Sequence, residues 1–314
     1  MPDKENEKVQ GDSRHSEISA CPEYEGSDVL RKIADHPCYD PKAQHKYGRI
    51  HLPVAPACNI QCRFCVREYD CVNESRPGVT SEVLTPQEAV SKLRNVLSEH
   101  PYIKVVGIAG PGDPLANDET FETLELVKKE FPDLLLCMST NGLALPDRVD
   151  DLVRLDISTL TVTVNAVDPK IMEKIYSHIV HEGKIYKGPE AAKILHRRQM
   201  EGIRAAVDAG IVVKINTVLI PTINDDHVVD IARRMSEMGV YIMNIIPMIP
   251  QGEFSSLRAP TTEERAKAQK ACEEFVSQMK HCRQCRADAY GLLGKDLSQV
   301  SEERRRLIRL KRDS

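Results

Sequence analysis

The sequence contains no tryptophan, and aromatic residues make up only 4% of its 314 positions. Aliphatic side chains must therefore build the core. No run of about 18 apolar residues is present, so no segment has the pattern of a membrane helix. Residues 1–20 are polar and charged and lack the apolar region of a secretory signal. We expect a cytoplasmic protein without a membrane partner.

The sequence also lacks an excess of charge of one sign. Lys and Arg total 43, and Asp and Glu total 47, which gives a formal net charge of −4. This balance creates no basic field, so we expect no nucleic-acid partner. Cysteine, in contrast, is plentiful, with 10 residues. In a reducing compartment, thiols in this number indicate metal ligation rather than disulfides.

Three of the cysteines lie on one short segment. Cys58, Cys62 and Cys65 form a C-x3-C-x2-C pattern directly after the apolar run at residues 51–56. Three thiolates can hold three irons of a 4Fe–4S cube and leave the fourth iron open to a small chelating cosubstrate. The alternative is a structural zinc loop, but zinc prefers four closed ligands from paired C-x2-C arms. The spacing therefore favours an iron–sulfur cluster.

Strand and helix patterns alternate along the chain. Apolar β-branched runs predict buried strands at residues 50–55, 104–109, 134–138, 159–164, 211–219 and 240–246. A capping box at residues 85–88 predicts the start of one helix. Further helical patterns lie between the strands at residues 119–130, 147–154, 168–178, 189–208 and 226–238. Six such units are too few for a closed eight-fold barrel, so we predict an α/β fold, an open (β/α)6 partial TIM barrel. Its site should lie at the C-terminal ends of the strands, where the cysteine loop begins.

Other segments flank this barrel, which we place at residues 49–250. We expect a disordered tail at 1–27, a cap segment at 28–48, an extension at 251–295 and a basic tail at 296–314. Cys21 in the first tail is either incidental or folds over a site. The extension should contain a helix from residue 262 to about 280, followed by Cys282 and Cys285. The basic tail is either a solvated helix end or a docking segment for an acidic partner.

A glycine-rich segment, residues 107–114, ends the second predicted strand. Its three glycines leave backbone N–H and C=O groups free to approach a ligand closely. Asp113, or the exposed carbonyls, would bind an ammonium group. A plain turn is the alternative, but a turn needs one glycine rather than three. The segment therefore favours ligand binding.

Polar residues also occur at the ends of the other predicted strands. Thr140 and Asn141 follow the third strand, Asn165 closes the fourth, and Asn216 interrupts the fifth. A buried asparagine in a strand is costly unless its amide is hydrogen-bonded. For each residue alone a helix cap or a turn is the alternative, and for Asn141 and Gly142 a turn is as good an explanation as a binding site. Together they predict a polar pocket that faces the cluster.

The cysteine loop after the first strand and the glycine-rich end of the second resemble the radical S-adenosylmethionine (SAM) superfamily. The resemblance implies that the open iron binds the amino and carboxylate groups of SAM. An electron from the cluster would then break a C–S bond and give a 5′-deoxyadenosyl radical. It also implies two groups of cofactor-binding residues on this rim. Near the methionine amine would lie Gly110, Pro111, Gly112 and Asp113, and near the rest of SAM would lie Thr140, Asn141, Asn165 and Asn216.

Longer motifs narrow the resemblance. Residues 36–39, 51–65, 69–78, 84–86, 109–115, 247–252 and the final C-x2-C pair are similar to the NifB family of nitrogenase cofactor biosynthesis. This implies an enzyme that fuses two 4Fe–4S clusters and inserts a SAM-derived carbide, giving the eight-iron precursor of the nitrogenase cofactor. One SAM would methylate a cluster sulfide, and a second would supply the radical. We expect the short form of the family, without a C-terminal NifX-like domain.

The resemblance also requires ligands for two additional substrate clusters. We expect Cys272, Cys282 and Cys285 to hold the cluster that is methylated, with Cys272 among the catalytic residues. The other cluster would be held by Cys38, Cys71 and Cys137. A buried structural cysteine is the alternative for Cys137, which lies in an apolar strand.

Further candidates are a nitrogen ligand and two residues of the loop that carries Cys71. The resemblance favours His51 as the ligand, with His36 second and His45 also possible. Glu74 and Arg76 would handle protons or anchor SAM, and a surface ion pair is the alternative.

The partners implied are iron–sulfur cluster donors, an electron donor such as ferredoxin, and a downstream scaffold or carrier of the nitrogenase cofactor. Two other functions fit parts of the pattern. One is a radical SAM peptide maturase with auxiliary clusters, and the other is a non-catalytic iron–sulfur carrier.

Overall fold

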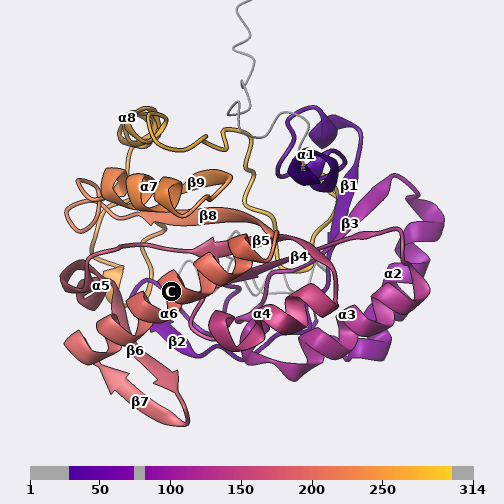
Figure 1. Cartoon of the computed structure of the whole chain (residues 1–314), viewed down its shortest axis with the longest axis horizontal. Coiled ribbons are helices and arrows are strands. Elements are labelled where there is room, and N and C mark those ends of the chain that lie inside the picture. Colours follow the sequence, from indigo (N-terminus) through magenta and orange to yellow (C-terminus); the bar gives the residue numbers. More distant parts are fainter. Residues whose placement is uncertain (1–27, 74–81, 299–314) are drawn as a thin grey trace, which may run out of the picture.

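Parallel strands form the centre of the protein (Figure 1). The computed structural model describes residues 28–73 and 82–298. In this part of the chain six parallel strands are hydrogen-bonded in the order β1 (Gly48–His51), β3 (Ile103–Ile108), β4 (Leu135–Thr140), β5 (Ile157–Thr163), β8 (Val212–Leu219) and β9 (Ile242–Pro247). Each overlaps a predicted strand, so the expected open (β/α)6 half-barrel is confirmed.

Helices cover one face of this sheet (Figure 1). They are α2 (Pro86–Glu99), α3 (Asp118–Glu130), α4 (Leu145–Arg154), α6 (Gly188–Asp208) and α7 (Val228–Glu237). Alternate strand residues such as Val106, Leu160 and Ile215 pack in one core with helix residues such as Leu93 and Ile203. Because side chains alternate along a strand, the residues between them face the hollow side of the half-barrel. That side carries the polar residues described below.

A second, three-stranded sheet holds the cysteine loop. It consists of β2 (Ile60–Cys62), β6 (Tyr176–His181) and β7 (Lys184–Lys187). The helix predicted at residues 168–178 was therefore wrong at its end, because α5 (Pro169–Ile175) stops where β6 starts. Cys62 pairs with Tyr176 and Ile60 with Ile179, so pairing with the cysteine loop overrides the helical pattern.

The segment after α8 (Thr262–Cys272) closes the open side of the half-barrel. The helix predicted to reach residue 280 ends at Cys272, since the next residues bond to β9 instead. The N–H of Met243 donates to Ser277 O (2.8 Å), and the N–H of Met279 donates to Met243 O (2.8 Å). Further along, β10 (Tyr290–Leu292) pairs with β1, and β11 (Lys295–Asp296) pairs with β10. Residues 277–292, here called the strap, thus join both edges of the parallel sheet.

The expected cap segment folds against the same region. It contains α1 (Asp28–Ile33) and the short helix η2 (Ala43–His45). Ile33 and Tyr39 pack against Val212 of β8, Ile242 of β9 and Met279, which belongs to the strap. Two other short helices, η3 (Pro114–Ala116) and η4 (Gly252–Phe254), follow the ends of β3 and β9. None of the helices in the described part of the chain is long and apolar enough to cross a membrane.

Several predictions lie outside the described residues. They concern the tail at residues 1–27 with Cys21, the roles of Glu74 and Arg76, and the basic tail at the end of the chain.

Candidate functional site

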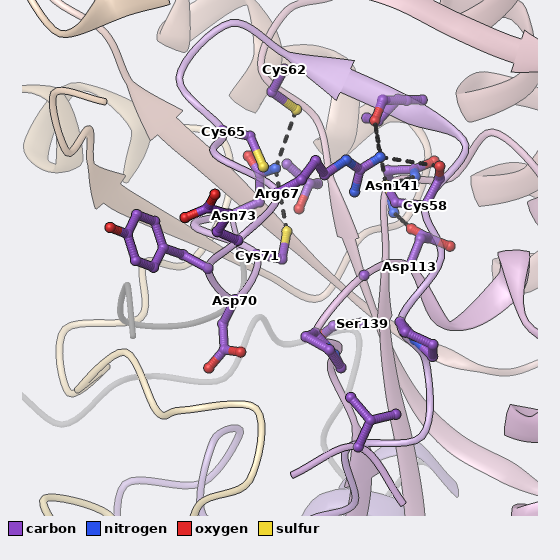
Figure 2. Close-up of a pocket in the computed structure, with 18 of the residues that line it drawn as sticks. Cys58, Cys62, Cys65, Arg67, Asp70, Cys71, Asn73, Asp113, Ser139 and Asn141 are labelled. Atoms are coloured by element: carbon purple, nitrogen blue, oxygen red, sulfur yellow. Dashed lines mark hydrogen bonds between the residues drawn. The ribbon is translucent and has the colours of Figure 1, made fainter. Parts of the chain in front are cut away.

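The three cysteines of the C-x3-C-x2-C motif lie together in a cavity of about 260 Å³. The loop after β1 provides all three thiols, and the ends of β3 and β4 form the opposite wall (Figure 2). From those ends the cavity is lined by Pro111, Gly112, Asp113, Ser139 and Asn141.

Backbone contacts fix the cysteine loop. Arg67 Nη2 donates to the carbonyls of Cys58 (3.1 Å) and Ile60 (2.8 Å). Gly112 N–H donates to Ala55 O (2.6 Å), and a Cβ on Gly112 would lie only 2.1 Å from Ala57 O. Gly112 therefore packs closely against the backbone of the cysteine loop itself, which a residue with a side chain could not do.

Burial governs the state of the three thiols. It raises the pKa of Cys58 and Cys65, and it raises the pKa of Cys62 well above its ordinary value. Thiolates are thus unfavourable here until a cation compensates them, as a metal ligand set requires. The described residues contain no group of three or more His, Cys, Asp or Glu side chains placed to hold a single metal ion. A 4Fe–4S cube makes a different demand, because each thiolate binds its own iron.

A second cavity, of about 60 Å³, lies on the hollow side of the sheet between the cap segment and the strap. Its walls contain four thiols and two imidazoles. They belong to Cys38 and His36 of the cap segment, His51 of β1, Cys137 of β4, and Cys282 and Cys285 of the strap. Ser139 lines both cavities, so the two adjoin at the end of β4.

Comparisons with known proteins agree with this arrangement. Residues 52–235 match the family model of the radical SAM superfamily. The FeMo cofactor biosynthesis protein NifB of Methanocaldococcus infernus is 52% identical over 260 residues, which cover 82% of this chain and 85% of that protein. The chain belongs to the NifB family. Both resemblances seen in the sequence are thereby confirmed.

Other NifB proteins are longer. That of Bradyrhizobium diazoefficiens is 50% identical over 278 residues, which cover 86% of this chain but 56% of that protein. The chain thus spans little more than half the length of such NifB relatives. Among solved structures, Streptococcus suis SuiB superposes with a TM-score of 0.54 at 12% identity, covering 81% of this chain and 54% of that one. This likeness shows the shared fold.

The two cysteine sets expected for the NifB substrate clusters are divided differently in the structure. Cys38 and Cys137 share the second cavity with Cys282 and Cys285. Cys71 instead lines the first cavity, beside the C-x3-C-x2-C thiols. Cys272 lines neither: it is 0% exposed in the helix-side core, and its thiol donates to Val228 O (3.4 Å). The expected grouping of Cys272 with the strap cysteines is therefore corrected.

Hydrogen bonds distinguish the candidate histidines. His51 Nδ1 lies 2.9 Å from Arg286 O, and because a carbonyl only accepts, Nδ1 carries the proton and Nε2 keeps its lone pair. His36 has the opposite tautomer, since its Nδ1 accepts from the N–H of Cys38 (3.2 Å). His36 Nε2 is therefore an N–H donor. Burial lowers the pKa of His51 to about 4 and that of His36 to about 3, so both rings are neutral. Of the three candidates, His51 is thus the one with a lone pair available at the second cavity, and His45 lines neither cavity.

Asp113 has a structural set of contacts. Its carboxylate accepts hydrogen bonds from Leu115 N (3.0 Å), from Thr140 Oγ1 (3.0 Å to each oxygen) and from Asn141 N (2.6 Å). Burial raises its pKa to about 6. With both oxygens occupied, Asp113 joins the ends of β3 and β4, and neither Thr140 nor Gly110 lines the cavity. Pro111, which is half-buried, and Gly112, which is buried, line the cavity beside Asp113.

Asn73 is a site residue that the sequence reading missed. Figure 2 shows it between two thiols: its Nδ2 lies 3.5 Å from Cys62 Sγ and 3.6 Å from Cys71 Sγ. Its Oδ1 accepts from Asn165 Nδ2 (3.3 Å), and its backbone carbonyl accepts from Asn216 Nδ2 (3.2 Å). Asn165, which lines neither cavity, therefore holds Asn73 rather than a ligand.

Asn216 and Asn141 retain cavity positions. Asn216 lines the second cavity rather than the first. Asn141 lines the first, where its Nδ2 lies 3.7 Å from Cys58 Sγ and 2.7 Å from Asn59 Oδ1. Of the residues expected near SAM, Asn141 is thus the one whose amide points at the cysteine motif.

Proposed function

We propose that this chain is a radical SAM enzyme that fuses two 4Fe–4S clusters and inserts a SAM-derived carbide, making the eight-iron precursor of the nitrogenase cofactor. Membership of the NifB family supports this, since its relatives carry the name FeMo cofactor biosynthesis protein. The observation that carries the proposal is the second, thiol-lined cavity adjoining the first at Ser139. A single-cluster radical enzyme needs no such second set of thiols.

The proposed roles follow from the donors available. Cys58, Cys62 and Cys65 would hold the resident cluster, which together with SAM supplies the radical chemistry and the methyl group. Pairing of β2 with β6 and the close approach of Gly112 to Ala57 hold the cysteine segment in place around this cavity. Asn141 would orient the bound cosubstrate, and the backbone at Pro111 and Gly112 would accept from its ammonium.

The second cavity would receive the substrate clusters. Its proposed ligands are the thiols of Cys38, Cys137, Cys282 and Cys285 and the lone pair of His51 Nε2. Cys71, at the first cavity, would contact whichever cluster stands between the two sites. Glu74 and Arg76 remain proposed for proton handling in the same loop. Cluster donors, a ferredoxin-type reductant and a downstream carrier would serve the enzyme in the cytoplasm.

Iron counting tests the proposal. After anaerobic reconstitution the wild type should hold about twelve irons and as many acid-labile sulfides per chain, the content of three 4Fe–4S cubes. The Cys282→Ala/Cys285→Ala variant should hold about four fewer. About four irons in the wild type, unchanged in this variant, would reject cluster fusion.

The other two functions give different results in the same preparation. A peptide maturase would cleave SAM after reduction without forming an eight-iron product. A carrier would hold clusters and leave SAM intact. The proposed enzyme should release 5′-deoxyadenosine and convert two bound clusters into one larger species.

A further inference from the structure

A lysine stands inside the second cavity. Lys214 lies in the middle of β8, is 8% exposed and lines the cavity together with the four thiols. Its ammonium lies 5.5 Å from the centre of the Tyr39 ring, a weak cation–π contact. No hydrogen bond or ion pair from this ammonium to any described residue is present. A buried cation is costly unless an anion compensates it.

The described residues of the cavity wall provide no carboxylate for this purpose. Among the described residues that line it, the charged side chains are Lys214 and Arg283, and neither Asp nor Glu occurs. A third base, Arg49, lies against the wall, with its Nη2 3.1 Å from Cys285 Sγ and its Nη1 donating to Gly291 O (2.8 Å). The site is therefore cationic until thiolates or an anionic ligand enter it.

A second unpartnered donor faces the same space. His36 Nε2 is buried and has no hydrogen-bond partner among the described residues, while His36 as a whole is 2% exposed and lines the cavity. Because His36 Nδ1 accepts from Cys38 N, this Nε2 carries the proton and needs an acceptor. Lys214 and His36 thus present two free N–H donor groups beside the thiols.

We propose that Lys214 and His36 bind the sulfides of an anionic iron–sulfur substrate in the second cavity. A 4Fe–4S core held by thiolates is an anion whose sulfides accept hydrogen bonds, and hydrogen bonds and charge around a cluster set its reduction potential. This inference rests on the proposed function only in taking the second cavity as a cluster site. It adds that the cavity selects its cargo by negative charge, with the thiols as ligands and these two donors as charge compensation.

The test uses the full chain with the three motif cysteines replaced by alanine, so that only clusters of the second cavity report. In this background Lys214→Met should lower the reconstituted iron content at least twofold at limiting iron and sulfide. Any cluster that remains should have a more negative midpoint potential in redox-titrated EPR, because a positive charge is lost. Lys214→Arg should restore both values, which a merely structural role of the side chain does not predict.

Controls separate the possible failures. Lys104→Met replaces a half-buried lysine of β3 that does not line the cavity, and it should match the background in both readouts. His36→Phe and Lys214→Gln enter the same series, with circular dichroism of each apo-protein, in case one variant fails to fold. Normal iron content and potential in all folded variants would overturn the inference. A background protein that binds no cluster at all would instead reject the proposed function of the cavity.

Discussion

A side-chain carbon placed on Gly107 would lie 2.9 Å from the Sγ of Cys137. Gly107 is at the same level of the sheet as Cys137 on one neighbouring strand and His51 on the other. The same carbon would lie 3.1 Å from the His51 ring. The absent side chain therefore leaves a thiol and an imidazole of the second cavity free to face a common ligand.

Gly107→Ala should impair cluster binding in the second cavity. The methyl group must displace Cys137, His51 or both, since its contacts are closer than van der Waals distance. We expect about four irons fewer per chain after reconstitution, while the cluster of the first cavity is retained. Gly183→Ala is the control: its φ of +72° strains the backbone, but no atom of the described residues lies within 4 Å of the added carbon, so it should keep the wild-type iron content. Equal iron in the wild type and Gly107→Ala would contradict the prediction.

Cys272→Ala should leave the iron content unchanged. Its thiol is buried among apolar residues, donates to Val228 O and lines neither cavity. The expected cost is about 1–2 kcal/mol in the free energy of unfolding, from lost packing and one weak hydrogen bond. Iron analysis and guanidinium unfolding of the same preparation measure both. A loss of about four irons would return Cys272 to the cluster ligands.

Asn73 and Asn165 should be energetically coupled. Their side chains share a 3.3 Å hydrogen bond, and both are buried. Each alanine variant should lower the free energy of unfolding by about 1–3 kcal/mol, because the partner amide is left unpaired. The double variant should deviate from additivity by about 0.5–3 kcal/mol. Asn95→Ala, at an exposed position of α2, should be additive with Asn165→Ala.

The carboxyl group of Asp113 should give the apo-protein a distinctive pH dependence. Burial raises its pKa from 3.8 to about 6. The folded state then binds the proton more tightly than the unfolded state. This contribution to stability is therefore complete below the unfolded-state pKa of 3.8 and is lost as pH rises through the folded-state pKa of about 6. Against Asp113→Asn, the wild type should lose on the order of 2 kcal/mol between about pH 4 and 6.5. If the guanidinium unfolding midpoints of the wild type and Asp113→Asn change with pH by the same amount across this range, the raised pKa of Asp113 is excluded.

Features encoded by nearby residues were predictable from the sequence. The strands follow from short apolar β-branched runs, and the capping box at Thr85 and Glu88 appears in the structure as predicted. The spacing of the cysteine motif likewise predicts that Cys58, Cys62 and Cys65 lie together, as they do in the first cavity. These features depend mainly on residues close together in the sequence, so they can be predicted without knowing which distant segments meet in the fold.

Membership of the second cavity was less predictable, because it depends on where distant segments meet. Cys272 is close to Cys282 in sequence, yet the helix ends at Cys272 and the strap leaves in another direction. Residues 272–280 contain no glycine or proline, so the sequence gives no signal that the helix ends there. A signal for Lys214 was present, since it is the one charged residue in the strand run at 211–219. Asn73 gave no comparable signal, because its role arises from contacts with Cys62, with Asn165 and with Asn216 of β8, all distant in sequence except the first.

The strap also determines when the second cavity can exist during synthesis. It pairs Tyr290 with Ile50 of the first strand, and Gln278 with Met243 of the last parallel strand. Contacts between residues so far apart in the chain form late, because the intervening segment must first be ordered. Two of the four thiols arrive with this final segment. The thiols of Cys282 and Cys285 can therefore join those of Cys38 and Cys137 only after the strap has paired with both edges of the sheet.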